Sequence, residues 1–390
     1  MPGTEPYDSY QDAQPFEAQS NGHDLTFYPA GRDRLDALIE VIDNAQRSLK
    51  MFYYMFQSDA AGTKVRDAIA RAAARGVAVH LLVDRFGTDA PESFFEPIVA
   101  EGGNFAVFSP KWSRRYLIRN HQKLLVADEE TAMVGGFNIS DHYFASPADD
   151  GWCDLGCKMR GPAVNELLRW FGQLAEWASD SKNQFFAIRR LIKDWQPGKG
   201  PVRLTLGGPT RAPSNWARMV KRDLAKASRL DMAMAYFSPP RSFRRLIWRI
   251  AKRGRVRLML AGKSDNAATI AASRALYRVL LKHGARLFEF QPTKLHMKLI
   301  VVDDAVYFGS ANFDHRSIRL NLELMLRFED AVLAEEMRDL ITGMEAGARE
   351  VTTKVHRKRR TFFNELKWLF GWFLVTTVDY TVSRGLNSDD

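Results

Sequence analysis

The stretch "NHQKLLVADEETAMVGGFN" (120–138) places a His, a Lys and an Asp at a fixed spacing, ahead of two Gly and an Asn. The stretch "LHMKLIVVDDAVYFGSAN" (295–312) repeats this pattern, and its histidine, His296, lies 175 positions after His121 (296 − 121). The residues after each Lys are apolar or small, as in strands that are buried on both faces. Because positions i and i+2 share one face of a strand, each His is expected to project beside its Lys.

The segments around the two motifs also correspond to one another. Each half reads helix, strand, helix and strand ahead of its motif, and the second helix ends near an Arg-Gly pair. This order of elements predicts two α/β units. The expected helices and strands are 33–46, 48–56, 61–76 and 77–84 in the first half, and 214–228, 229–238, 241–254 and 255–262 in the second.

The fold predicted from this duplication is an α/β protein made of two α/β/α sandwich halves, with one active site at their pseudo-twofold interface. A polar N-terminus suggests a disordered tail, and a Gly- and Pro-rich segment suggests a linker between the halves. The expected divisions are a tail at 1–24, a first half at 25–195, a linker at 196–213, a second half at 214–350 and a basic-aromatic tail at 351–390.

The charge of the chain favours an anionic partner. Its 390 residues carry a formal net charge of +10, which fits either nucleic acid or a membrane surface. Two cysteines, Cys153 and Cys157, are too few for a disulfide scaffold or for a zinc site made of cysteine alone. No segment reaches the ~20 apolar residues that a membrane span needs.

The motif residues suit chemistry on a phosphodiester. Together they supply two imidazoles, two ammonium groups and the amides of Asn138 and Asn312, beside glycines that would let a ligand approach the backbone. One neutral imidazole can attack phosphorus, and the other can protonate the leaving oxygen. The motifs hold no carboxylate cluster for a metal, so neither a metal nor another cofactor is expected.

Four acidic residues accompany the motifs. Asp154 and Glu323 each lie in an apolar strand, where a carboxylate is costly unless it is paired, so we expect each to orient the histidine of its own half. Asp128 and Asp303 fall at short turns, which favours a structural role over a catalytic one. His142 and His315 follow the two Asn residues, and their position leaves open whether they line the site.

This doubled pattern resembles the phospholipase D superfamily over roughly residues 25–350. The resemblance implies a bilobal fold with one site between the halves and a covalent phosphohistidine, with His121 as the nucleophile and His296 as the general acid. It implies a catalytic set of His121, Lys123, Asp128, His296, Lys298 and Asp303, phosphate-binding residues Asn138, Asn312 and Ser310, and His-orienting residues Asp154 and Glu323.

The segments "GGFNISDHYF" and "GSANFDHRSIRLNLEL" are similar to those of bacterial cardiolipin synthases of the short type, which lack N-terminal transmembrane helices. That similarity implies a phosphatidyltransferase acting on an anionic phospholipid such as phosphatidylglycerol, peripheral to the cytoplasmic face of the cell inner membrane, with no nucleic acid as partner. The alternative is a phospholipase D-type phosphodiesterase that hydrolyses phospholipid headgroups or nucleic acid. A non-catalytic membrane adaptor is a further alternative, which two intact motifs oppose.

The C-terminal tail joins a basic run, 354–360, to an apolar stretch. Phe362, Leu366, Leu369 and Phe373 share one helical face, flanked by Trp368 and Trp372, which is typical of a helix at an anionic lipid interface. The alternative is a helix packed on the core of the protein. A second basic segment contains Lys111, Arg114, Arg115 and Arg119, and is either a solvated surface or a guide for headgroups.

Overall fold

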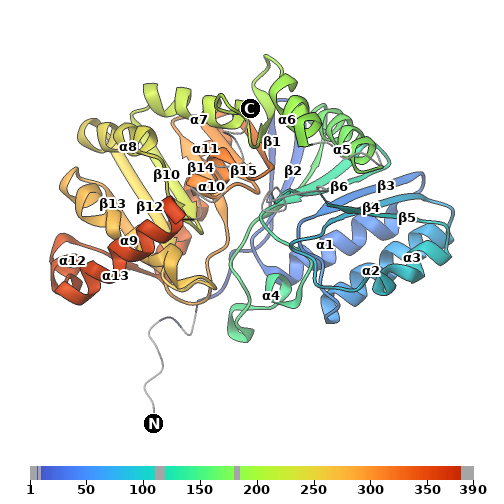
Figure 1. Cartoon of the computed structure of the whole chain (residues 1–390), viewed down its shortest axis with the longest axis horizontal. Coiled ribbons are helices and arrows are strands. Elements are labelled where there is room, and N and C mark those ends of the chain that lie inside the picture. The colour runs from blue at the N-terminus through green and yellow to red at the C-terminus, as the bar shows by residue number, and fades with distance from the viewer. Residues whose placement is uncertain (1–6, 8–9, 110–118, 180–184, 379–390) are drawn as a thin grey trace, which may run out of the picture.

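The computed structural model describes residues 7, 10–109, 119–179 and 185–378, and has two lobes that lie side by side (Figure 1). Each lobe is built on an eight-stranded mixed sheet. In the first sheet the strand order is β1 (Phe16–Ser20), β2 (His23–Tyr28), β8 (Gly156–Arg160), β7 (Thr131–Gly135), β6 (Lys123–Ala127), β3 (Ser48–Tyr53), β4 (Ala78–Asp84) and β5 (Asn104–Phe108).

The second sheet has the same internal order, which confirms the predicted duplication and the α/β fold class. From edge to edge it contains β18 (Ala348–Glu350), β13 (Arg286–Phe290), β12 (Arg255–Ala261), β10 (Arg229–Met234), β14 (Lys298–Val302), β15 (Ala305–Gly309), β17 (Glu323–Glu329) and β9 (Val202–Gly207). The central pairs β3·β4 and β10·β12 are parallel, whereas β3·β6 and β10·β14 are antiparallel. A two-stranded sheet of β11 (Phe237–Ser238) and β16 (Phe313–Asp314) lies beside the second motif.

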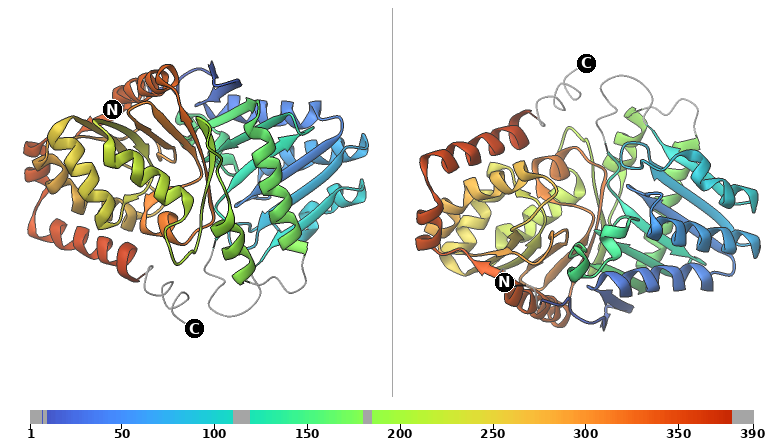
Figure 2. Two further views of the ribbon diagram at one scale, coloured as in Figure 1. Left: turned by 90° about the horizontal axis from the view of Figure 1, so that it is seen from above. Right: turned by 90° about the horizontal axis from the view of Figure 1, so that it is seen from below.

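Helices cover both outer faces and fill the space between the sheets (Figures 1 and 2). One apolar core lies under the outer helices of the first half, a second under those of the second half, and a third joins the two sheets around α5 and α11. The helices are α1 (Gly31–Asn44), α2 (Ala60–Ala74), α3 (Glu96–Ala100), α4 (Asp141–Phe144), α5 (Ala163–Ser179), α6 (Phe185–Asp194), α7 (Asn215–Lys226), α8 (Arg241–Arg253), α9 (Ala267–Lys282), α10 (His315–Arg319), α11 (Ala331–Gly343), α12 (Thr353–Arg359) and α13 (Phe362–Phe373).

Two expected boundaries are wrong. Part of the supposed disordered tail, residues 16–24, forms β1 and the start of β2, and the ring of Tyr10 packs 5.0 Å from that of Phe290. The supposed linker contains β9, which pairs with β17 and occupies the place that β2 has in the first half. Both segments close an edge of a sheet, so the two halves are joined by structured elements.

The C-terminal helices pack along α9 at the margin of the second half (Figure 2). The inner face of α13 is buried through Trp368, whose ring stacks 5.4 Å from that of His356, and through Gly371, where a Cβ atom would lie 2.5 Å from Ala271 Cβ. Its outer face leaves large apolar side chains exposed. Within the described residues, no helix combines the length and hydropathy that crossing a bilayer requires.

The two motif aspartates lie at the hairpin turns that follow β6 and β14. Asp128 accepts backbone N–H bonds from Gln46, Arg47 and Ser48, at 2.7 to 3.2 Å, and Asp303 accepts bonds from Ser228 and Arg229 in the same way. Burial alone would raise the pKa of Asp128, but these hydrogen bonds lower it. Asp128 lies five positions after Lys123, which is about 16 Å along an extended strand. The expectation that they belong to the catalytic set is therefore wrong, and their turn position correctly indicated a structural role.

We predict that Asp128→Ala destabilises the first half without disabling the chemistry. The substitution leaves three backbone donors without their carboxylate, which should cost about 1–3 kcal/mol of unfolding free energy. Denaturant unfolding measures this loss, and turnover per folded molecule should stay within a few-fold of the unsubstituted protein. Asp304→Ala, at an exposed neighbour of Asp303, is the matched control. Loss of turnover in a fully folded Asp128→Ala protein would contradict the structural role.

Candidate active site

The two motifs meet where the halves join, and the backbone crosses between them. The segment entering the first motif pairs with the second half, since His121 N donates to Leu322 O at 2.9 Å. The segment entering the second motif pairs with the first half, since His296 N donates to Cys153 O at 2.7 Å. Leu322 directly precedes Glu323, and Cys153 directly precedes Asp154. Each histidine is therefore brought to the carboxylate of the other half.

The side chains complete this crossing. His121 Nδ1 lies 3.3 Å from Glu323 Oε2 and 3.1 Å from the carbonyl oxygen of Ser310. His296 Nδ1 lies 2.6 Å from Asp154 Oδ2. Both carboxylates are fully buried. The expectation that each carboxylate serves its own half is wrong, although the two residues themselves were correctly singled out.

Each carboxylate has its own support. Ser310 Oγ donates to Glu323 Oε2 at 2.5 Å and accepts from Leu324 N at 3.0 Å, while Asn321 Nδ2 lies 3.3 Å from Glu323 Oε1. The single proton of the Ser310 hydroxyl is thus donated within the protein, to Glu323. Binding of phosphate by Ser310 stays a prediction, because in the empty site this hydroxyl supports the carboxylate.

Asp154 is supported by backbone and by a buried cation that sequence reasoning missed. Leu155 N donates to Asp154 Oδ1 at 2.8 Å. Arg34, fully buried on α1, donates to the carbonyl oxygens of Asp154 and Tyr143 at 2.8 and 2.7 Å. A lone Arg on an amphipathic helix carries no sequence signal for such a role, because its partners are carbonyl groups far along the chain.

A glycine of the first motif makes room for this carboxylate. A Cβ atom on Gly136 would lie 2.4 Å from Asp154 Oδ1 and 3.0 Å from Lys298 Cδ. Any side chain at this position would displace the group that orients His296. We expected the motif glycines to admit a ligand, but the space at Gly136 is taken by the protein's own carboxylate.

The two lysines lie beside their histidines, as the strand spacing predicted. Lys123 Nζ donates to the carbonyl oxygen of His121 at 2.6 Å. Lys298 Nζ donates to the carbonyl oxygen of His296 and lies 3.0 Å from its Nε2. Burial lowers the pKa of both lysines, well below its usual value for Lys123, so a bound anion favours their charged forms and interacts strongly with them in this medium of low polarity.

The two asparagines offer amide atoms without protein partners. Asn138 Nδ2 donates to Tyr143 Oη at 2.8 Å. The Oδ1 atoms of Asn138 and Asn312 are buried and have no hydrogen-bond partner among the described residues. Buried polar atoms without partners are uncommon and point to a missing ligand or water. Because the two ends of an amide are interchangeable by rotation, each Asn can turn its NH₂ group toward an anionic oxygen.

Burial and charge set the protonation of the site. Burial, assisted by Lys123, lowers the pKa of His121 to about 4, and burial with Lys298 lowers that of His296 to about 4. Burial lowers the pKa of Lys298 to about 8. Burial opposes ionisation of Glu323, but the nearby His121 lowers its pKa. At neutral pH the empty site therefore holds neutral imidazoles, with Nδ1 directed at a carboxylate and Nε2 able to act as a base.

Aromatic rings enclose both imidazoles. The ring of Tyr54 lies 4.9 Å from that of His121, and the rings of Tyr143 and Trp152 lie 5.0 and 5.5 Å from that of His296. The ring of His142 stacks on that of Trp152, with 5.7 Å between their centroids. This stacking on Trp152 is what links His142 to the site.

Asp84 and His315 also have shifted pKa values. Asp84, buried at the end of β4, accepts the N–H of Asn120 at 2.9 Å and so fixes the peptide ahead of His121; burial raises its pKa to about 7. Burial, with Arg319, lowers the pKa of His315 to about 4.

Of the second basic segment, Lys111, Arg114 and Arg115 lie outside the described residues. Arg119 stacks 4.1 Å over the ring of Phe86.

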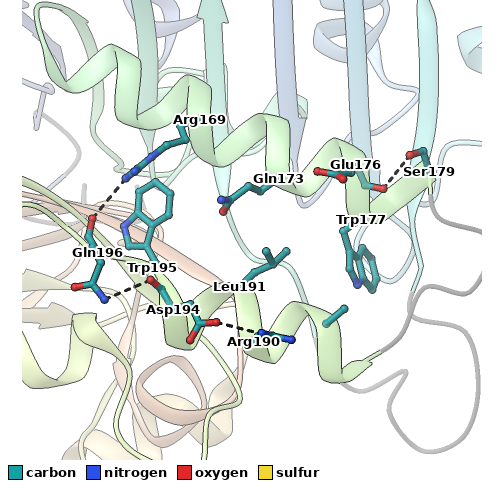
Figure 3. A pocket seen from close by; sticks show the side chains of 11 residues that line it. Arg169, Gln173, Glu176, Trp177, Ser179, Arg190, Leu191, Asp194, Trp195 and Gln196 are labelled. Atoms are coloured by element: carbon teal, nitrogen blue, oxygen red, sulfur yellow. Dashed lines mark hydrogen bonds and ion pairs between the residues drawn. The ribbon is translucent and has the colours of Figure 1, made fainter.

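A cavity of about 620 Å³ lies away from these residues, between α5 and α6 (Figure 3). Trp177, Leu191 and Trp195 line it, together with polar groups such as Arg169 and Asp194. None of the predicted site residues is part of its lining. We therefore assign the chemistry to the motif residues at the interface rather than to this cavity.

Comparison with known proteins agrees with this geometry. The solved structure of a phosphatidylserine synthase from Haemophilus influenzae superposes with a TM-score of 0.72 at 14% identity, covering 96% of this chain and 97% of that one, which shows a shared fold. Cardiolipin synthase A of Pseudomonas putida is 28% identical over 341 residues, which is 84% of this chain and 70% of the relative. Cardiolipin synthase 1 of Bacillus cereus is 30% identical over 327 residues, which is 79% of this chain and 64% of that relative.

The family described as "Cardiolipin synthase, PLD-like domain" matches residues 38–174 and 220–344, one segment in each half and each containing one motif. These two segments make up more than half of the chain, and the resemblance to the phospholipase D superfamily is thereby confirmed. The chain belongs to the cardiolipin synthase, PLD-like domain family.

Proposed function

We propose that the protein is a phosphatidyltransferase of the cardiolipin synthase type, which moves a phosphatidyl group between phospholipids through a covalent phosphohistidine and without a metal. One observation carries the proposal. His121, which is partly buried, and His296, which is buried, face one interface, and each has Nδ1 beside a carboxylate, so Nε2 is the nitrogen left for chemistry. This arrangement supplies a nucleophile and a proton donor within one site.

In the first step, His121 Nε2 attacks phosphorus, and the bond from phosphorus to the leaving headgroup oxygen breaks. His296 supplies the proton that this oxygen needs. In the empty site His296 is neutral, but the negative charge of a bound phosphodiester raises the proton affinity of both imidazoles. Asp154 then stabilises the imidazolium through the 2.6 Å contact at Nδ1.

In the second step, a hydroxyl group of an acceptor lipid attacks the phosphohistidine. Its proton returns to His296, and the nitrogen–phosphorus bond breaks with its electron pair left on His121. Lys123, Lys298 and the two asparagine amides hold the non-bridging oxygens, where charge builds up in the transition state. We assign attack to His121 rather than to His296 because Lys298 Nζ lies 2.7 Å from His296 Nδ1 and 3.0 Å from its Nε2, where the ammonium group hinders attack by that imidazole.

We predict that His121→Ala abolishes both turnover and the phosphoenzyme. His296→Ala should slow formation of the intermediate about 10²- to 10⁴-fold, as expected for loss of a general acid. Acid-quenched protein incubated with a labelled-phosphate lipid measures the intermediate directly. His80→Ala, on an exposed position of β4, is the matched control. A phosphoenzyme that persists in His121→Ala, or turnover that EDTA removes and a metal restores, would contradict the mechanism.

The proposed substrate is an anionic phospholipid, with phosphatidylglycerol as donor and acceptor. Membership in the family and the names of the relatives support a lipid substrate. The alternative is a phosphodiesterase in which water attacks the same intermediate, on a lipid or on nucleic acid. The motif chemistry is common to both, so the distinction lies in the acceptor.

We predict that liposomes of phosphatidylglycerol yield cardiolipin and glycerol, whereas a labelled oligonucleotide stays intact. Mass spectrometry of the lipids, together with gel analysis of the oligonucleotide, measures both in one incubation. The His121→Ala protein controls for contaminating enzymes. Phosphatidic acid as the lipid product would favour hydrolysis, and cleavage of the oligonucleotide without a lipid product would favour a nuclease.

We also propose that α13 binds the membrane surface, at the cytoplasmic face of the inner membrane. Six large apolar side chains of this helix are 48 to 79% exposed: Phe362, Phe363, Leu366, Leu369, Phe370 and Phe373. The adjoining basic run contributes less than its sequence suggests, because Arg359 and Arg360 pair with Glu289 and Glu365. Lys354, Arg357 and Lys358 are exposed and can interact with anionic lipid.

Helix α13 combines the two alternatives that the sequence left open, a helix at a lipid interface and a helix packed on the core of the protein. The inner face of α13, with Trp368, packs on the protein, and the outer face remains for lipid. The expectation that Trp368 enters the bilayer is therefore wrong. Because deletion of the tail would uncover α9, substitutions on the outer face test membrane binding more cleanly.

We predict that replacing Phe362, Leu366, Leu369 and Phe373 by Ser weakens binding to anionic liposomes by several kcal/mol. The estimate uses about 25 cal/mol for each Å² of apolar area that the unsubstituted helix removes from water when it binds the membrane and that the variant lacks. Cosedimentation measures binding, and thermal unfolding should show a native melting temperature because these side chains contact solvent.

Val99→Ser with Val332→Ser removes exposed apolar side chains elsewhere and is the matched control. Turnover of a short-chain, water-soluble lipid should be equal in all three proteins. If the α13 variant binds liposomes as tightly as the unsubstituted protein, another surface attaches this chain to the membrane.

A further inference from the structure

The second half carries a polar pair that the first half lacks, at the end of the sheet that holds His296. Tyr236 Oη donates to Asp265 Oδ1 at 2.6 Å, and Ser264 Oγ donates to the same oxygen at 3.0 Å. Tyr236 follows β10, and Asp265 lies between β12 and α9. The carboxyl ends of the parallel strands β10 and β12 lie at one edge, where open α/β sheets commonly bind ligands.

Backbone bonds place Tyr236 beside the second motif. Met234 pairs with Lys298, and Ala235 N donates to Met297 O at 3.1 Å, so continuing this antiparallel register brings Tyr236 level with His296. The carbonyl oxygen of Tyr236 also accepts from Phe313 N, next to Asn312, at 3.1 Å. The pair therefore adjoins both the imidazole and the amide of the second motif.

The carboxylate of Asp265 interacts electrostatically with His296 and Lys298 of the site. Burial alone would raise the pKa of Asp265, but the Tyr236 hydrogen bond, together with the attraction of the protonated form of His296, lowers it, so the carboxylate is ionised. Burial lowers the pKa of Lys298, and Asp265 is one of the carboxylates that oppose this change. Asp265 is exposed, and its Oδ2 has no hydrogen-bond partner among the described residues. One carboxylate oxygen thus remains for a ligand.

Comparison of the halves shows that this pair breaks the pseudo-symmetry. Asp84 ends β4 as Ala261 ends β12, so Thr88 is the counterpart of Asp265, four residues past each strand. The Thr88 hydroxyl accepts from Phe56 N at 3.2 Å and is used by backbone. By the same count from β3 and β10, Met55 is the counterpart of Tyr236. The first half therefore offers neither a phenol nor a carboxylate at these positions.

We propose that Asp265 and Tyr236 form the subsite for the hydroxyl-bearing headgroup that leaves and enters beside His296, and so select an acceptor whose headgroup is a neutral polyol. The inference rests on the proposed phosphatidyl transfer. Asp265 Oδ2 accepts a hydrogen bond from a second hydroxyl of the headgroup, while the reacting hydroxyl gives its proton to His296 and its oxygen to phosphorus. The bond between phosphorus and His121 breaks in the same step.

The surroundings favour a neutral headgroup over a cationic one. Lys298 lies in the site, and its charge interacts with that of Asp265. This ammonium group repels a cationic amine that approaches Asp265. A hydroxyl carries no charge, so it keeps its hydrogen bond to the carboxylate without that cost.

The test compares acceptors within one incubation. Short-chain phosphatidylglycerol is supplied with equal concentrations of deuterated glycerol, methanol and ethanolamine, and mass spectrometry measures each phosphatidyl product and phosphatidic acid. Methanol has no second hydroxyl to reach Asp265. We expect Asp265→Asn and Tyr236→Phe to lower the ratio of glycerol to methanol product, by about tenfold or more for Asp265→Asn, as for loss of a hydrogen bond to a charged group. The rate of methanol transfer should stay within a few-fold.

Asp265→Glu, which keeps the carboxylate, should recover part of the ratio, and Asp89→Asn, in the corresponding loop of the first half, should leave it unchanged. An unaltered ratio in Asp265→Asn would overturn the subsite. An equal loss with all acceptors would do so as well, because it would indicate a general effect on His296. Selective loss of the ethanolamine product would reassign Asp265 to a cationic headgroup. If the unsubstituted protein transfers to no alcohol, the proposed function itself fails, and this inference with it.

Discussion

The site depends on one constraint, which is that each catalytic imidazole is oriented by a carboxylate from the other half. His121 contacts Glu323 and His296 contacts Asp154, and the backbone ahead of each histidine is bonded to the residue ahead of that carboxylate. Neither half alone can hold a histidine in its working orientation. The elements that close the halves together, β2, β9 and the core around α5 and α11, are therefore requirements of the chemistry as well as of stability.

The same pairing of residues across the two halves also offsets the cost of burying charged groups. Two lysines and two carboxylates are buried within one interface, and an isolated buried charge would be strongly unfavourable. Mutual attraction keeps Asp154 and Glu323 ionised although burial opposes this, while burial and the lysines keep both imidazoles neutral. The empty site is thus balanced, and it becomes able to hold one more proton when a phosphodiester adds its negative charge. In the proposed mechanism, binding of the substrate and readiness for acid catalysis are in this way one event.

Much of this arrangement could be predicted from the sequence, and the failures have physical reasons. The repeated motif predicted the duplicated fold and the residues that meet. Side chains alternate between the two faces of a strand, so the face on which each motif residue lies follows from the local sequence. The crossing could not be predicted, since a carboxylate about 30 residues after its histidine is consistent with pairing within a half or between halves. Arg34 was missed because its partners are carbonyl groups. The strand β1 was missed because its sequence, "FEAQS", is polar and short.

A symmetric scaffold still has to produce two unequal histidines. The His, Lys, Asp and Asn of the motif are the same in both halves, so the difference must come from the residues around them, which include Gly136 in one motif and Ser310 in the other. Glu323 is held by neutral donors, the Ser310 hydroxyl and the Asn321 amide, whereas Asp154 lies beside the buried cation of Arg34. The Nε2 of His296 contacts Lys298, and near it the second half adds Tyr236 and Asp265. The imidazole with the more open Nε2 suits attack on phosphorus, and the one beside hydroxyl-binding groups suits exchange of a proton with an alcohol. In the proposed mechanism, divergence around the shared His, Lys, Asp and Asn residues thus assigns the two roles.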